Sequence, residues 1–276
     1  MTKLKGNTHL FRRRAGLVAA IAITVATLSG TASVQAQEKS IKVGIMSGED
    51  EDVWRAVAAE ADKKGLKIKT VVFNDYNQPN EALERGEVDA NAFQHKPYLD
   101  NQIKQHGYKI VAVGYTGVWP IGLYSKKHKA LADLKEGAQI GIPNDPSNEG
   151  RALRVLQNEG LLKLKDGTGI LATIADISEN SRGLKIKELD AGIVGRSIDD
   201  LDAAVVNTDW ALKAGLGQDN RIAQEPIKDN PYRNFIAVKQ GQENEDWVKT
   251  LVASYQNDTV KAVFDKVYKG TGLSAY

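Results

Sequence analysis

The feature that most constrains the fold is a strand, helix, strand order that begins at residue 41. Residues 41–48, IKVGIMSG, alternate in polarity and then turn, as a β-strand does. Residues 49–65 place Trp54 and Val57 at helical spacing, and residues 66–73, LKIKTVVF, alternate again. Because a helix between two strands connects parallel neighbours, this order predicts an α/β protein with a mainly parallel sheet.

The same order recurs along the rest of the chain. Residues 88–93 and 109–116 are predicted strands of the same first core, with helices before and after the first of them. A second α/β core is predicted between Ile121 and Glu225. Its strand and helix pairs are AQIGIPND with PSNEGRALRVLQNEG, and LDAAVVN with TDWALKAG.

The C-terminal part is predicted to return to the first core. NPYRNFIAVK has the pattern of a strand, and residues 244–270 have that of one or two amphipathic helices, split near Asn257 and Asp258. The sequence therefore predicts two lobes joined by two chain crossings, with a cleft between them in which a small ligand binds.

The predicted organisation has three parts. Residues 1–36 form a signal segment, residues 37–119 with 226–276 form lobe I, and residues 120–225 form lobe II. No internal repeat and no long Pro/Ser linker interrupts this plan.

The first residues have the pattern of a secretory signal. The basic run at Arg12 to Arg14 precedes the apolar stretch AGLVAAIAITVATLSG and the small residues TASVQA. Val34 and Ala36 suit a cleavage site, so we expect a mature start near Gln37 and a periplasmic location. An uncleaved membrane anchor is the alternative.

Charge and cysteine content argue against nucleic-acid binding and against stabilisation by disulfides. Residues 1–36 carry five of the 37 Lys and Arg residues and none of the 35 Asp and Glu residues, so the remainder has a formal charge of about −3. Nucleic acid is not an expected partner, because binding it needs a concentrated basic face. The chain contains no cysteine, so its lobes must be held by ordinary apolar cores.

Catalytic and metal-binding patterns are weak. The sequence has no G-x-S-x-G, no phosphate loop and no calcium-loop spacing. His106 and His128 lie in lysine-rich segments typical of a solvated surface, and His95 has no patterned partner. A zinc site needs three or four ligands, which the QHK motif around His95 does not supply. We expect no catalytic residue, no metal and no cofactor.

Two polar stretches follow predicted strands and are candidates for a binding site. DANAFQHKPYLD, residues 89–100, contains His95. In GIPNDPSNEGRAL, residues 141–153, Asn148 lies in the turn before a predicted helix that carries Arg151 in its first turn. A free helix N-terminus and a guanidinium both suit a carboxylate. Helix-capping residues beside a surface arginine are the equally common alternative.

Asparagines and aromatic residues complete the candidate set. Asn207 ends one predicted strand and Asn234 lies within another, and an amide can accept from an ammonium while it donates to a carboxylate. Each asparagine taken singly is more often a turn or strand-end residue. The aromatic residues Phe73, Tyr76 and Phe93 line either the pocket or the core, whereas helical position favours the core for Tyr98.

Several of these stretches together resemble a known family. FNDYNQPNEAL, VDANAFQHKPYL, GYKIVAVG, SKKHKALADLKEGAQIGIPNDPSNEGRAL and NPYRNFI are similar to the methionine-binding NlpA-type substrate-binding proteins of bacterial ABC importers. The resemblance runs from about Ile41 to the C-terminus. It implies the two-lobed α/β fold of periplasmic binding proteins, similar to type II, whose lobes close around a free amino acid.

The resemblance also implies roles for particular residues. Arg151 would bind the α-carboxylate with Asn148 beside it. Asn207 and Asn234 would bind the ammonium and the carboxylate lone pairs that Arg151 does not use. The side-chain pocket would be lined by Phe73, Tyr76, Phe93 and His95, with His95 neutral. The implied partners are a membrane permease and its ATPase, and the implied state is a monomer.

The chain departs from the family pattern at a few positions. Thr31 stands where family members usually carry the lipid-bearing cysteine, so a non-lipidated periplasmic protein is expected. Asp209 and Trp210 stand where Thr and Tyr are usual, and Trp119 lies near a crossing. We expect L-methionine or a close analogue as the ligand. The alternatives are another apolar amino acid, a short methionine-containing peptide, or an enzyme on the same scaffold that uses His95 as a base.

Overall fold

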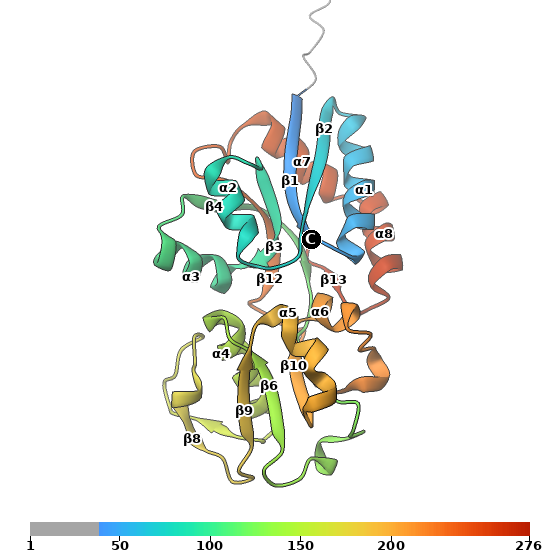
Figure 1. Cartoon of the computed structure of the whole chain (residues 1–276). Coiled ribbons are helices and arrows are strands. Elements are labelled where there is room, and N and C mark those ends of the chain that lie inside the picture. Colours follow the sequence, from blue (N-terminus) through green and yellow to red (C-terminus); the bar gives the residue numbers. More distant parts are fainter. Residues whose placement is uncertain (1–38) are drawn as a thin grey trace, which may run out of the picture. The chain divides into compact units, whose positions relative to one another are not determined.

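A computed structural model describes residues 39–276 (Figure 1). The predicted signal segment lies outside the described residues. Within the described part of the chain, no helix combines the length and the apolar character needed to cross a membrane.

The first lobe is built on a six-stranded mixed sheet in the order β13-β4-β12-β3-β1-β2. β1 pairs with β2 and β3 in parallel, whereas β12 runs antiparallel to both β3 and β4. The expectation of a mainly parallel sheet is therefore wrong for this lobe, because the chain re-enters it from the other lobe in the opposite direction. The strands are β1 (Lys39–Met46), β2 (Leu66–Phe73), β3 (Ala90–His95), β4 (Ile110–Val118), β12 (Arg233–Lys239) and β13 (Leu273–Ser274).

Helices cover both faces of this sheet. One face packs against α1, α7 and α8 around Trp54 and Tyr255, whose ring centroids are 5.4 Å apart. The other face packs against α2 and α3 around Leu83 and Leu99 (Figure 1). The helices are α1 (Glu49–Asp62), α2 (Gln78–Arg85), α3 (Lys96–His106), α7 (Asp246–Tyr255) and α8 (Asp258–Tyr268). The predicted split near Asn257 is confirmed, because the Asn257 side chain caps α8 by accepting from Val260 N–H at 3.0 Å.

The second lobe contains a five-stranded sheet in the order β11-β5-β10-β6-β9. β6 runs parallel to β9 and β10, and β5 runs antiparallel to β10 and β11. Its strands are β5 (Gly122–Tyr124), β6 (Gln139–Pro143), β9 (Lys185–Leu189), β10 (Ala203–Val206) and β11 (Arg221–Gln224). Its helices are α4 (Pro146–Asn158), α5 (Ala191–Val194) and α6 (Thr208–Lys213). β7 (Lys163–Leu164) and β8 (Ile177–Glu179) form a separate two-stranded antiparallel sheet. Short 3₁₀ turns lie at Leu131–Asp133, Ile174–Asp176, Gly195–Asp200 and Gln218–Asn220.

Two connections join the lobes. β4 ends at Val118 before β5 begins at Gly122, and β11 ends at Gln224 before β12 begins at Arg233. The connections are tied together, because Ile121 N–H donates to the Glu225 carboxylate at 3.1 Å. The predicted two-lobed α/β fold is confirmed. The predicted boundaries at 119/120 and 225/226 fall within these connections and stay a prediction.

Candidate functional site

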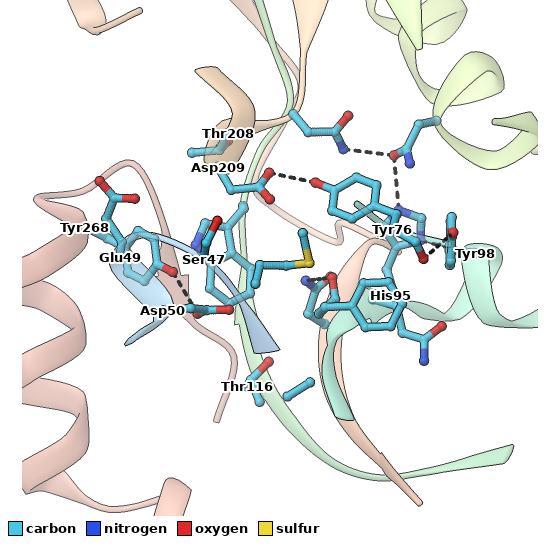
Figure 2. A pocket seen from close by; sticks show the side chains of 18 of the residues that line it. Ser47, Glu49, Asp50, Tyr76, His95, Tyr98, Thr116, Thr208, Asp209 and Tyr268 are labelled. Carbon is cyan, nitrogen blue, oxygen red and sulfur yellow. Dashed lines mark hydrogen bonds between the residues drawn. The ribbon is translucent and has the colours of Figure 1, made fainter. Parts of the chain in front are cut away.

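A cavity is lined by residues from both lobes and from the first connection (Figure 2). It includes seven of the eight side chains that the sequence predicts for the binding site. From the first lobe these are Tyr76, Phe93, His95 and Asn234, and from the second lobe they are Asn148, Arg151 and Asn207. The remaining one, Phe73, is not among the lining residues.

Phe73 contributes to the core instead. It ends β2, where its ring lies beside Gly44 so closely that a Cβ on Gly44 would be 2.9 Å from Phe73 Cε2. The ring packs against two of the apolar clusters of the protein. The expectation that Phe73 lines the pocket is therefore not met, because the end of β2 directs its ring toward the neighbouring strand.

One end of the cavity is a cluster of aromatic rings. The Tyr76 ring lies 6.0 Å from that of Phe93, 6.1 Å from that of Tyr98 and 5.7 Å from that of Trp210, measured between centroids. The Tyr98 hydroxyl donates to the Tyr76 backbone carbonyl at 2.8 Å, which fixes the segment that carries Tyr76. Tyr98 therefore both packs in the core and lines the cavity. This end suits an apolar or thioether side chain.

Arg151 lies in the second turn of α4, one turn later than predicted, and is almost fully buried. Its Nε donates to Glu225 Oε2 at 2.9 Å, and its Nη2 donates to Glu225 Oε1 and, at 2.8 Å, to the Trp119 carbonyl. The Tyr232 ring stacks on the guanidinium, with Cζ 4.2 Å from the ring centroid. These bonds use Nε and Nη2, and Nη1 takes part in none of them. The pair with Glu225 also makes this wall of the cavity electrically neutral.

The N-terminus of α4 is capped from within the protein. The Asp145 carboxylate accepts from the Asn148 backbone N–H at 3.1 Å and from the Ser147 hydroxyl at 2.9 Å. The Asn148 amide nitrogen also donates to both oxygens of Asp145, at 3.0 and 2.9 Å. The expectation that this helix end offers free donors to a ligand anion is therefore wrong, because a side-chain carboxylate already occupies that place.

Two asparagine amides of the second lobe are hydrogen-bonded to each other, and one of them also contacts His95 of the first lobe. Asn148 Oδ1 accepts from Asn207 Nδ2 at 3.0 Å and lies 3.2 Å from His95 Nε2. The first of these bonds orients the Asn207 amide, and its Oδ1 is buried with no hydrogen-bond partner. Asn234 Nδ2 donates to the Phe93 carbonyl at 2.9 Å. A buried acceptor without a partner is costly, so Asn207 Oδ1 is suited to a ligand donor.

His95 is held in one neutral form. Its Nδ1 accepts from the Tyr98 backbone N–H at 3.2 Å as the cap of α3, so Nε2 carries the proton and donates to Asn148. Burial and, next, the nearby charge of Arg151 lower the pKa of His95 to about 3. Both ring nitrogens are thus engaged within the protein, and the lone pair that a general base needs is occupied.

The opposite end of the cavity is acidic. Figure 2 shows Glu49 and Asp50 on the other side of the cavity from His95 and Tyr98. Asp50 Oδ1 accepts from the Tyr268 hydroxyl at 2.9 Å. Burial raises the pKa of Asp50 to about 7, and the nearby charge of Asp209 adds to the rise.

Asp209 faces the same end from the second lobe. Its Oδ1 accepts from the Tyr76 hydroxyl at 2.7 Å, and Asp209 lines the cavity. Burial raises its pKa, while Lys213 and the Tyr76 bond oppose that rise. Among residues 39–276 no group of three or more His, Cys, Asp or Glu residues has an arrangement that could hold a metal ion.

Sequence reasoning did not find the charged partners of the site. Glu225, Asp50 and Asp209 each make their decisive contact with a residue far along the chain, at separations of 74 residues for Arg151–Glu225 and 133 for Tyr76–Asp209. The one signal was the unusual pair Asp209 and Trp210, which the sequence places next to a predicted pocket residue, Asn207.

Named bacterial lipoproteins are similar to this chain over most of its length. The D-methionine-binding lipoprotein MetQ of Escherichia coli K12 is 45% identical over 254 residues, which cover 90% of this chain and 93% of that protein. Outer membrane lipoprotein 1 of Mannheimia haemolytica is 44% identical over 261 residues, with 92% and 94% covered.

A solved structure agrees in fold. The nutrient-binding protein from Burkholderia cenocepacia bound to methionine has a TM-score of 0.83 and 51% sequence identity, and the match covers 86% of this chain and 100% of that one. The profile of the NlpA lipoprotein family matches residues 41–276. The chain therefore belongs to the NlpA lipoprotein family.

Proposed function

We propose that this protein is a substrate-binding protein that captures methionine in the cavity between its lobes and delivers it to an ABC importer. The proposal is supported by family membership and by relatives that are named for binding methionine. It is also supported by the cavity itself, which combines aromatic rings with groups for a zwitterion. It involves no catalysis.

The observation that carries the proposal is the unpartnered Asn207 Oδ1 beside the Arg151 guanidinium. We propose that the ligand ammonium donates to Asn207 Oδ1 and to the Asn234 oxygen, and that its carboxylate accepts from Arg151 Nη1. The ligand side chain then lies against Tyr76 and Phe93. Because Arg151 is paired with Glu225 and His95 is neutral, the wall that these residues form carries no net charge and suits the zwitterionic end of an amino acid.

An enzymatic role for His95 finds no support in the geometry. Its Nδ1 lone pair accepts from the Tyr98 N–H, and its pKa of about 3 leaves it a poor base at neutral pH. The aromatic end of the cavity determines whether the ligand is L-methionine, D-methionine, another apolar amino acid or a short methionine-containing peptide. The named relatives favour methionine, in the D or the L form.

The remaining parts of the account are proposals of the same kind. The protein would act in the periplasm as a monomer, with residues 37–119 and 226–276 in one lobe and residues 120–225 in the other. Ligand binding would shift an equilibrium between open and closed lobes, which a permease and its ATPase would read. The relatives are named lipoproteins, whereas this sequence contains no cysteine.

The proposal is tested by recovering what the protein retains. The chain from residue 37 onward is incubated with the twenty amino acids and with both enantiomers of methionine, separated from free solute and denatured. Chiral chromatography with mass spectrometry should recover about one equivalent of unchanged methionine. Recovery of a different amino acid, of a chemically altered product, or of nothing would contradict the proposal.

A further inference from the structure

The short helix α6 presents three side chains of the second lobe to the first lobe. Asp209 Oδ1 accepts from the Tyr76 hydroxyl at 2.7 Å. The next residue, Trp210, packs its ring edge against the Tyr76 ring, with centroids 5.7 Å apart and planes at 60°. Tyr76 itself belongs to the first lobe, where its backbone carbonyl is held by Tyr98. Tyr76 is therefore hydrogen-bonded through its backbone to its own lobe and contacted through its side chain by the second lobe.

Lys213 extends this contact by one helical turn. Its Cε would lie 3.4 Å from a Cβ placed on Gly48, so its aliphatic stem lies against the turn between β1 and α1. The first turn of α1 after Gly48 is acidic, and Asp50 and Lys213 attract one another. The Lys213 ammonium also lies 4.0 Å from the centroid of the Trp210 ring, which holds that ring in place.

These contacts differ from the other hydrogen bonds at the acidic end of the cavity. The bond from Tyr268 to Asp50 joins two residues of the first lobe, so it persists whatever the separation of the lobes. The bond from Tyr76 to Asp209 joins the two lobes, so it exists only while they are together. Its acceptor is a half-buried carboxylate, and a hydrogen bond to a charged acceptor is stronger than one between neutral groups.

We propose that α6 latches the closed cleft, with the Tyr76–Asp209 hydrogen bond as the latch that sets how fast a bound ligand escapes. This inference rests on the proposed function, because it assumes a cleft that opens and closes around a ligand. Tyr76 thus has two parts with separate tasks. Its ring lines the ligand pocket, and its hydroxyl holds the lobes together.

The latch can be tested by the lifetime of the closed state. Because the chain contains no cysteine, Gln105→Cys in α3 and Asp166→Cys in the second lobe can carry a fluorophore pair without competing sites. Both positions are exposed. Single-molecule energy transfer then records each opening event in the presence and in the absence of L-methionine.

Tyr76→Phe, which keeps the ring, and Asp209→Ala are each expected to shorten the closed-state lifetime about tenfold or more. The double variant should open no faster than the faster single variant, because both changes remove the same bond. The melting temperature of the ligand-free protein should be unchanged, since the bond is absent from the open form. Tyr276→Phe is the matched control, because its hydroxyl bonds the Tyr255 carbonyl within the first lobe.

The outcomes separate this inference from the proposed function. A wild-type protein that closes transiently but ignores methionine contradicts the proposed ligand, while its closed-state lifetimes still test the latch. Equal closed-state lifetimes in wild type, Tyr76→Phe and Asp209→Ala would overturn the latch. It would equally be overturned by a wild type that shows no closed state, or by variants that lower only the melting temperature.

Discussion

Arg151 is a buried charge that contributes to the fold and belongs to the proposed ligand site. Its guanidinium is paired with Glu225, and the two side chains are only 3% and 6% exposed. Sequence reasoning predicted Arg151 as a ligand residue because arginine is the best partner for a carboxylate. It could not predict Glu225, because that pairing depends on how the second connection returns past α4.

Removing Arg151 alone should therefore harm both stability and binding. Arg151→Ala leaves the Glu225 carboxylate buried without its partner, which costs about 3–5 kcal/mol of folding free energy. The double variant Arg151→Met with Glu225→Gln removes both charges and should melt close to the wild type. It should nevertheless bind methionine at least about 100-fold more weakly, because the ligand carboxylate loses its charged donor.

The measurements are thermal melts and calorimetric titrations of both variants. Glu225→Gln alone is the matched control, since it keeps the guanidinium and its charge toward the ligand. If the double variant bound methionine as tightly as the wild type, Arg151 would have no part in ligand recognition.

At the scale of elements, the ends of helices and strands were the least predictable features. Asn148 was expected beside free helix donors, yet Asp145 caps α4 and fixes the Asn148 amide as part of the site. The predicted strand around Asn234 exists, but β12 enters the first sheet antiparallel to its neighbours. Local sequence specifies that a strand forms, whereas its direction depends on the distant connection that delivers it.

The contact between α1 and α6 should make ligand binding depend on pH. Asp50 in the first turn of α1 has a pKa of about 7, raised from its ordinary 3.8 by burial and by Asp209 of α6. Closure brings Asp209 toward Asp50 and raises the pKa of Asp50, so the proposed closure takes up a proton at pH values below about 7. Methionine affinity should therefore fall as pH rises over that range, by at most about tenfold per pH unit, and level off above it.

Calorimetric titrations at pH 5, 6, 7 and 8 measure this dependence. Asp50→Asn, which cannot ionise, should flatten the profile and leave only the contributions of Asp209 and Asp145, whose pKa values are also raised by burial. An affinity that rises with pH, or a slope unchanged by Asp50→Asn, would contradict the assignment.

At the scale of the whole molecule, the two-lobed α/β fold and the family were predictable from the sequence, and both are confirmed. The signal for the fold is local, since each strand and helix carries its own periodicity, whereas the family was predicted from the resemblance of whole sequence stretches such as VDANAFQHKPYL. Two polar residues of the cavity were predictable, because Asn207 follows an apolar strand directly and Asn234 lies within another. The place of the Phe73 ring outside the cavity was not predictable, because the direction of a ring at a strand end depends on the neighbouring residue, here Gly44.

The most direct test of the account is a calorimetric titration with L-methionine. The chain from residue 37 onward is first unfolded and refolded to remove any retained ligand, and its fold is verified by circular dichroism. The account predicts one-to-one binding with a Kd of about 1 μM or lower. No heat of binding from the folded protein would contradict the claim that the cavity between the lobes binds L-methionine.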